Sequence, residues 1–207
     1  MQIARRLKLI ILLAGITCSP AVAQGPWSIF VAGGAAGFGG ASKATTDVGA
    51  DVSQYKPGAT TRFHLGAART FGRVSVAMDA SYAKAALNAD GDGVWVGINP
   101  GFTLYDIRLL ANYELARLGT GTTLLIGLGP MLQIWSGRAV DNTLTRLGGA
   151  AALTLTVPVS TRFALFTSGS LGVAGSPFDQ TTLDEVGLFE PTNVWTRELA
   201  VGIRYGL

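Results

Sequence analysis

The sequence has little charge and almost no cysteine. Asp, Glu, Lys and Arg make up 14% of its 207 residues, against roughly 25% in typical soluble domains. The one cysteine, Cys18, lies near the N-terminus, so the chain cannot form an internal disulfide. With a hydrophobic fraction of 48% and 28 glycines, the composition is too apolar for an ordinary soluble domain or for a disordered chain.

The N-terminal segment has the three parts of a secretory signal peptide. A basic stretch, residues 5–8, precedes an apolar stretch, residues 9–17, and Ala21-Val22-Ala23 forms a cleavage site of small residues. The apolar stretch is shorter than the ~20 residues that a membrane-spanning helix needs, which disfavours a retained anchor. We expect residues 1–23 to be a cleaved signal peptide and residues 24–207 to form one domain.

Removing that segment takes away three of the 16 Lys and Arg residues and none of the 13 acidic residues. The remaining chain is neutral and lacks the positive charge typical of nucleic-acid binding, so we predict no nucleic-acid partner. It also lacks any run of about 18 apolar residues, which argues against a transmembrane helix. The other structure that can span lipid is a β-barrel.

Eight segments alternate between apolar residues and small or polar ones with the period of a strand. In the clearest, Tyr105, Ile107 and Leu109 alternate with Asp106 and Arg108. We predict an all-β fold, an eight-stranded antiparallel transmembrane up-and-down β-barrel with short periplasmic turns and long external loops. The expected short turns lie near Gly72, Gly119 and Pro158, and the expected long loops cover residues 34–61, 84–101, 136–145 and 174–194.

The composition of the two strand faces indicates which one points outward. The non-apolar faces consist mostly of Gly, Ala, Ser and Thr, whereas a soluble surface wants roughly a quarter to a third charged residues. Such faces suit a narrow lumen better than water, so we expect the apolar faces to meet lipid, the reverse of a soluble lipocalin-like barrel. Aromatic residues near opposite strand ends predict two interfacial girdles: Phe63 and Phe71, Tyr105 and Tyr113, Trp195 and Tyr205.

The chain ends in a strict alternation formed by Leu199, Val201, Ile203, Tyr205 and Leu207. This tail resembles the C-terminal assembly signal of Gram-negative outer-membrane proteins, with Leu207 where that signal usually has an aromatic residue. The whole mature chain resembles the small eight-stranded barrels of the OmpX, opacity-protein and OmpA transmembrane-domain class. The resemblance implies the outer membrane of a Gram-negative bacterium, contact with outer-membrane lipid and insertion by the barrel-assembly machinery. We expect the last strand to pair with the first, so that no strand edge is left open.

Several charged side chains fall on the expected inner face. In a narrow lumen they are poorly solvated and should pair with one another. We interpret them as a salt-bridged plug, because eight strands leave an interior just wide enough for side chains; a gated ion path or a catalytic set are the alternatives. The predicted lumen charge network is Arg62, His64, Asp79, Asp106, Arg108, Glu114, Arg146, Glu198 and Arg204.

Any acid–base chemistry would depend on His64, the only histidine. Some eight-stranded outer-membrane enzymes modify lipid A with a His, a nearby Ser and an acid, and His64 with Asp79 and Ser81 could form such a set. The His and Ser spacing of the deacylases is absent, because Leu65 and Gly66 follow His64. We therefore predict no enzyme and no cofactor, with lipid A modification as the alternative.

A short acidic stretch matches the opening of a calcium loop. Asn88, Asp90 and Asp92 provide oxygen ligands at alternate positions, but the twelfth position is Asn99 rather than the bidentate Glu that such loops need. Asp and Gly also form ordinary turns. We predict a hairpin tip here, with calcium binding as the alternative.

The function that these patterns favour is a structural or surface-interaction role through the external loops, which would contact an extracellular ligand that the sequence does not identify. The alternative is OmpW-like passage of small hydrophobic molecules, for which the tail NVWTRELAVGIRYGL gives some support.

Overall fold

The structure is a computed structural model that describes residues 26–44, 53–90, 95–119, 121–137, 143–186 and 189–207. The predicted signal peptide lies outside these residues. None of the helices in the described ranges is both long enough and apolar enough to cross a membrane.

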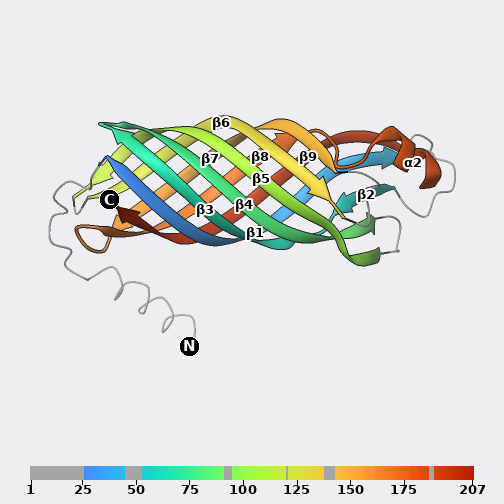
Figure 1. The fold of residues 1–207 in the computed structure, drawn as a ribbon, viewed down its shortest axis with the longest axis horizontal. Coiled ribbons are helices and arrows are strands. Elements are labelled where there is room, and N and C mark those ends of the chain that lie inside the picture. Colours follow the sequence, from blue (N-terminus) through green and yellow to red (C-terminus); the bar gives the residue numbers. More distant parts are fainter. Residues whose placement is uncertain (1–25, 45–52, 91–94, 120, 138–142, 187–188) are drawn as a thin grey trace, which may run out of the picture.

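The described residues form nine strands and one short helix (Figure 1). In chain order they are β1 (Trp27–Ala44), β2 (Gln54–Pro57), β3 (Thr60–Phe71), β4 (Val74–Asp90), β5 (Trp95–Leu118), β6 (Thr122–Ser136), β7 (Leu144–Pro158), β8 (Phe163–Ala174), α2 (Gln180–Val186) and β9 (Phe189–Gly206).

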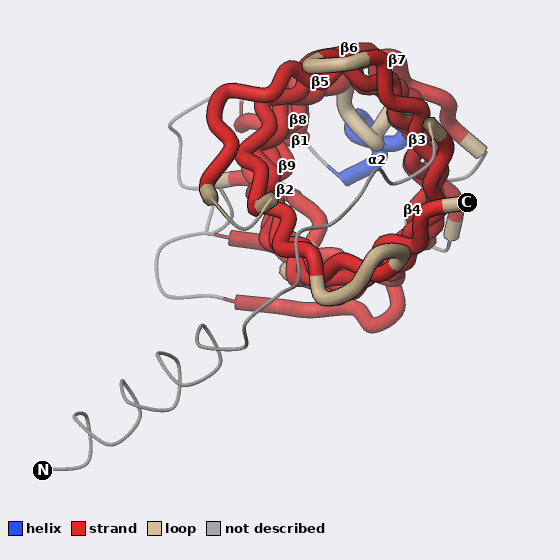
Figure 2. The backbone as a smooth tube through the Cα atoms, turned by 90° about the vertical axis from the view of Figure 1, so that its left-hand side faces the viewer, coloured by secondary structure: helices blue, strands red, loops and turns tan. Residues whose placement is uncertain are grey.

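Eight of the described strands form a ring of antiparallel neighbours, which Figure 2 shows end-on. From β3 to β9 each strand pairs with the next one along the chain. β1 completes the ring by pairing with β3 on one side and with β9 on the other, from Ser28↔Gly206 to Ala44↔Phe189. The predicted up-and-down barrel and the predicted pairing of the last strand with the first are confirmed.

The prediction of eight strands misses one, because β2 is a ninth strand. Its four residues pair with the last residues of β4, from Gln54↔Asp90 to Pro57↔Leu87. β2 and α2 lie at the same end of the barrel, opposite the C-terminus (Figure 1). We call this end the long-loop end, and we call the end where β3 is followed by β4, β5 by β6 and β7 by β8 the short-turn end.

Much of what the sequence predicts as long loops is strand. β1 continues to Ala44 and β9 begins at Phe189, while β4 and β5 extend as a paired ladder to Asp90↔Trp95. The glycine-rich stretch of residues 33–40, expected as a flexible loop, lies within β1. These extensions form because their inward side chains pack together in a buried apolar cluster.

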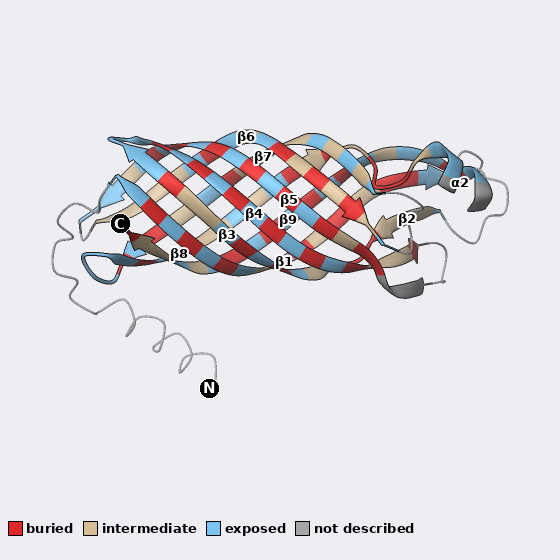
Figure 3. Cartoon of the chain, in the orientation of Figure 1, coloured by how far each residue is buried: buried red, intermediate tan, exposed pale blue. Residues whose placement is uncertain are grey.

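The outer wall follows the period-two pattern (Figure 3). Along β4, Val74, Val76 and Met78 are exposed, whereas Ser75 and Ala77 between them are buried. The wall is apolar although it is exposed, which is what contact with lipid requires. Cross-strand register aligns aromatic residues near both ends of the wall: Phe63↔Tyr82 and Tyr82↔Tyr105 at one level, Phe163↔Tyr205 at the other.

Candidate functional site

A cluster of six charged or titratable side chains crosses the lumen. All six are buried, and they come from four strands, β3, β4, β5 and β9. We call them the lumen cluster: Arg62, His64, Asp79, Asp106, Arg108 and Glu198. These are six of the nine residues of the predicted lumen charge network.

Glu198 is the most connected carboxylate of the lumen cluster. Its Oε2 lies 3.3 Å from Arg62 Nη1 and 3.4 Å from Arg108 Nη1. Its Oε1 contacts His64 Nε2. Because β9 contributes Glu198 while β3 and β5 contribute its partners, the contacts tie together strands that are not neighbours in the sheet.

The other two carboxylates complete the lumen cluster. Asp79 Oδ2 accepts from Arg108 Nη2 at 2.7 Å and lies 3.2 Å from His64 Nδ1. Asp106 Oδ2 accepts from Arg62 Nη1 at 3.0 Å. Three carboxylates therefore face two guanidinium groups and one imidazole, so each charged group has a partner of opposite sign or the imidazole beside it.

Small residues on β1 make room for the lumen cluster. Ala36 is the cross-strand partner of Glu198, and Gly34 lies nearby. A Cβ at Gly34 would lie 3.0 Å from Glu198 Oε1 and 2.9 Å from the carbonyl oxygen of Leu199. The stretch of glycine and alanine in β1 thus allows long side chains from the neighbouring strands to fill the centre of the barrel.

The other three residues of the predicted network lie outside the lumen cluster. Glu114 accepts from Arg117 at 2.6 and 3.0 Å at the short-turn end. Arg146 donates to the carbonyl oxygens of Ser176 and Phe178 at the long-loop end. Arg204 lies toward the short-turn end, over two phenylalanine rings. The alternation of the sequence correctly predicts that these three residues face inward, but it does not predict their position along the barrel axis.

Ser81 is the cross-strand partner of His64, but its hydroxyl does not make the hydrogen bond to the imidazole that a serine nucleophile would require. Both ring nitrogens of His64 contact carboxylates, Nδ1 that of Asp79 and Nε2 that of Glu198. The buried Ser81 Oγ has no hydrogen-bond partner among the described residues. The Ser/His/Asp geometry behind the lipid A alternative is therefore not assembled in this structure.

The candidate calcium residues lie in a strand rather than in a loop, as far as they are described. Asn88 and Asp90 are the final part of β4, and Asp92 lies outside the described residues. Asp90 Oδ2 accepts from Lys56 Nζ at 2.6 Å and from Gln54 Nε2 at 3.2 Å. No group of three or more His, Cys, Asp or Glu side chains in the described ranges is arranged to hold a metal ion.

The contact between β2 and β4 should respond to acid. The hydrogen bond from Lys56, with that from Gln54, lowers the pKa of the exposed Asp90 carboxyl below its ordinary value. The contribution of this pair to stability is therefore complete above the ordinary pKa of aspartate and is lost as the pH falls through the lower, folded-state pKa. A carboxyl-carbon NMR titration should place the Asp90 midpoint below the ordinary value, and Lys56→Ala should move it upward. An unchanged midpoint in that variant would show that the pair does not form in solution.

An aromatic cluster fills the lumen on the long-loop side of the lumen cluster. Trp135 packs edge-to-face against Phe38 at 5.7 Å and against Phe102 at 5.6 Å, and Phe102 contacts Phe178 at 5.6 Å. Sequence reasoning missed these residues as lumen residues, because Phe38 and Phe178 fall in stretches expected to be loops, while Phe102 and Trp135 lie directly beside such stretches. The inward positions of Phe38 and Phe102 within continued period-two patterns were the available signal.

A second aromatic pair lies on the short-turn side of the lumen cluster. The rings of Phe30 and Phe166 meet edge-to-face at 5.7 Å. Phe166 interrupts the polar alternation of β8, and the structure shows that it points inward like its neighbours of the same parity. Between this pair and the lumen cluster, His64, Glu198 and Arg204 help to line a cavity of about 70 Å³, with room for only a few water molecules.

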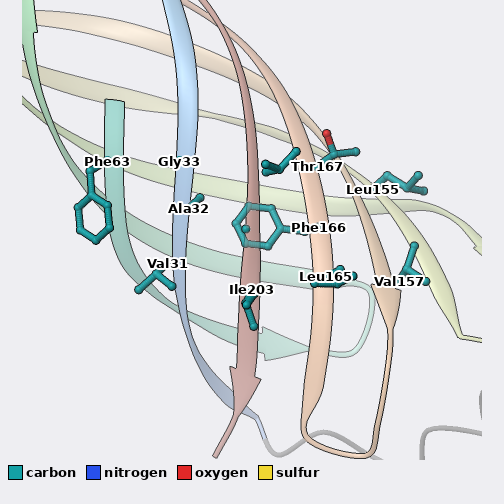
Figure 4. Close-up of a pocket in the computed structure, with 12 residues that line it drawn as sticks. Val31, Ala32, Gly33, Phe63, Leu155, Val157, Leu165, Phe166, Thr167 and Ile203 are labelled. Atoms are coloured by element: carbon teal, nitrogen blue, oxygen red, sulfur yellow. The ribbon is translucent and has the colours of Figure 1, made fainter. Parts of the chain in front are cut away.

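A large apolar hollow lies on the outer wall rather than in the lumen. It measures about 630 Å³, and its lining residues come from the neighbouring strands β3, β1, β9, β8 and β7; Figure 4 shows their side chains, among them Phe63 and Leu155. Gly33 is one of its lining residues and presents no side chain to the outside. The strand pairings beneath the hollow are continuous, so it is a groove on the lipid-facing wall.

Adding a side chain should affect stability very differently at two glycines of this groove. At Gly202, which faces inward, a Cβ would meet the Val31 carbonyl oxygen and lie 2.6 Å from the Phe166 ring, whereas at Gly33 nothing lies within 4 Å. We expect Gly202→Val to destabilise the barrel by about 3 kcal/mol through overpacking, and Gly33→Val to change stability by less than about 1 kcal/mol. Urea unfolding in lipid vesicles measures both, and equal losses would contradict the assigned faces.

Comparison with solved structures identifies the fold. Neisserial surface protein A (NspA) matches with a TM-score of 0.58 at 14% identity over 88% of this chain and 98% of its own. OprG from Pseudomonas aeruginosa matches with a TM-score of 0.59 at 13% identity over 91% of this chain and 99% of its own. No protein-family model matches the chain, and no curated protein matches its sequence. The chain thus has the fold of the small outer-membrane β-barrel proteins, as the sequence predicts.

Proposed function

We propose that the protein is a non-conducting barrel of a Gram-negative outer membrane, with a structural or surface-interaction role exerted through its long-loop end. The filled lumen carries this proposal. The aromatic cluster around Trp135, the lumen cluster and the Phe30–Phe166 pair follow one another along the axis. An ion would have to break several buried ion pairs to pass, at a cost of several kcal/mol each.

The outer wall supports the membrane location. Large apolar side chains are exposed around the ring, and aromatic residues lie near both of its ends, as at a lipid–water interface. In this class of barrel the short turns face the periplasm and the longer connections face outward. The long-loop end is therefore the external end in our proposal, and outer-membrane lipid and the barrel-assembly machinery are the expected partners.

The long-loop end is built as a folded platform. The ladder of β4 and β5 continues past the Tyr82↔Tyr105 level to Asp90↔Trp95, and β2 adds a strand to it. Buried side chains from α2 and β9, Leu183 and Phe189, join the same apolar cluster as Trp135. A barrel that only filled the membrane would not need this extension, so we infer that it presents a surface to the outside.

Two measurements test this proposal, one on the purified barrel and one on cells. In planar bilayers the purified barrel should give no stable conductance steps. Cells displaying it should attach to a protein-coated or polysaccharide-coated surface more than cells without it. Reversing one exposed charge of the long-loop end at a time, in the separate variants Lys43→Glu and Glu190→Lys, should abolish the difference. Stable channels, or attachment that does not depend on the barrel, would overturn the proposal.

The enzyme and transport alternatives make different predictions. A lipid A-modifying enzyme would change the lipid A mass spectrum on overexpression, and His64→Ala would abolish the change. Passage of small hydrophobic molecules would give barrel-dependent uptake into vesicles. We expect an unchanged spectrum and no uptake, because both nitrogens of His64 contact carboxylates and the outer groove lies over continuous strand pairings.

A further inference from the structure

A polar cavity opens at the short-turn end of the barrel. It measures about 510 Å³, and it is lined by residues from both sides of the first two short turns and from the β7 side of the third, including Gly72, Gly121 and Pro158. We call it the vestibule. It lies on the opposite side of the Phe30–Phe166 pair from the lumen cluster, and Arg204 lines both the vestibule and the 70 Å³ cavity beyond it.

The charge of the vestibule is unbalanced. Three arginines line it, Arg73, Arg117 and Arg204, against one acid, Glu114. That acid is already bound, because Arg117 donates to both of its carboxylate oxygens at 3.0 and 2.6 Å. The vestibule therefore has an excess of positive charge that no carboxylate in its described lining neutralises.

Arg204 is the deepest of these cations and has no polar partner in the described part of the chain. Its Cζ lies 5.8 Å from the ring centre of Phe30 and 5.7 Å from that of Phe166. Its Nε is buried and makes no hydrogen bond. Contact with aromatic faces offsets part of the cost of burying a cation, but it leaves the Nε–H donor of the guanidinium unsatisfied.

A second orphan donor lines the same cavity. Thr156 is 6% exposed, and its Oγ1 makes no hydrogen bond to any described residue. Buried hydroxyl and guanidinium donors are nearly always paired, so two unpaired ones at one cavity call for an acceptor from outside the chain. An oxyanion supplies both the acceptor atoms and the missing negative charge, and the planar fork of an arginine fits it well.

We propose that the vestibule is a binding site for a phosphate-type oxyanion that enters from the short-turn end, with Arg204 as its main contact and the Thr156 hydroxyl as a second donor. The site is separate from the surface role proposed above and does not depend on it. The phosphate group belongs either to a free phosphorylated compound or to a phospholipid head group, since the vestibule opens at the barrel end where the outward aromatic pair Phe163↔Tyr205 lies.

Titration of the purified barrel with inorganic phosphate tests the site, at constant ionic strength and in a zwitterionic detergent. We expect saturable binding by calorimetry. Arg204→Gln should weaken it at least tenfold, as expected for the loss of a charged hydrogen bond, and Thr156→Val should weaken it by a smaller factor. Arg162→Gln is the matched control, because Arg162 lies at the same end, bonded to the Tyr205 hydroxyl, and does not line the vestibule.

A second arm distinguishes the source of the phosphate. The same variants are placed in bilayers with and without phosphatidylglycerol, and the lipid retained after mild delipidation is counted by mass spectrometry. If inorganic phosphate binds in a way that depends on Arg204, the ligand is a free phosphorylated compound. If retention of phosphatidylglycerol depends on Arg204, the ligand is a lipid head group. Should Arg204→Gln fail to fold by heat-modifiable gel mobility, Arg204→Lys keeps the charge without the fork and should still weaken binding. The proposal is overturned if neither arm shows binding, or if Arg162→Gln reduces it equally.

Discussion

Glu198→Ala is expected to destabilise the barrel by about 3–5 kcal/mol, because removing one partner from a buried ion-pair group leaves uncompensated charges behind. Glu198 is 7% exposed and contacts Arg62, His64 and Arg108. Arg62 would retain Asp106 and Arg108 would retain Asp79, but the three carboxylates would become two. Both guanidinium groups would lose one of their carboxylate contacts, and His64 Nε2 would lose its partner, in a poorly hydrated space.

Equilibrium urea unfolding in lipid vesicles, followed by tryptophan fluorescence, measures this loss. Glu190→Ala is the matched control, since Glu190 lies on the same strand but is exposed at the long-loop end. We expect that substitution to cost less than about 0.5 kcal/mol. If Glu198→Ala costs no more than the control, water must reach the lumen cluster freely, and the filled lumen on which the proposed function rests would be wrong.

Trp135→Ala should cost a similar amount, about 3–5 kcal/mol, by a different mechanism. Trp135 is fully buried between the rings of Phe38 and Phe102, and its Nε1 donates to Gln133 Oε1 at 3.2 Å. Truncation removes the centre of the aromatic cluster and leaves a cavity that the rigid strand ladder cannot collapse to fill. The platform at the long-loop end should loosen before the rest of the barrel.

Limited proteolysis of the folded barrel distinguishes local loosening from global unfolding. In Trp135→Ala, cleavage should begin at the long-loop end while the gel mobility of the heat-resistant core persists. Trp195→Ala provides the comparison, because Trp195 is 60% exposed on the outer wall and does not belong to the aromatic cluster. Equal protease resistance in the two variants would mean that the platform is held by its backbone pairing alone.

The ring itself could be predicted from sequence because period two and alternating connection lengths are local signals. They remain visible wherever the outward residues are large, as in β4 and β5. They fade in β1, where Gly33, Ala35 and Gly37 take the outward positions, so that the strand looks like a loop. β2 could not be predicted, because its four residues are held by pairing with β4, which lies far from it in sequence.

The candidate site was predictable in part for a related reason. Alternation assigns Arg204 and Glu198 to the same inner face, and the structure places both inside the barrel. Alternation does not give height along the axis, which depends on strand tilt and on the stagger between strands. Only three-dimensional register shows that Glu198 meets Arg62 and Arg108, while Arg204, six residues further along β9, lies beside the vestibule.

The pairing of β1 with β9, which we call the seam, is the contact of the ring with the longest range in sequence. Its pairs, such as Ser28↔Gly206, join residues separated by almost the whole described chain, whereas every other strand pairing of the ring joins strands close in sequence. Contacts of such long range form slowly, because the loss of chain entropy is not offset by strand pairing until the ladder is complete. Until that moment both edge strands present unpaired backbone groups, one of them the glycine-rich β1. The seam is therefore the step at which an assembling chain is most exposed to wrong pairing, and sealing it converts a sheet that could join to others into a ring in which each of the eight strands has a neighbour on both sides.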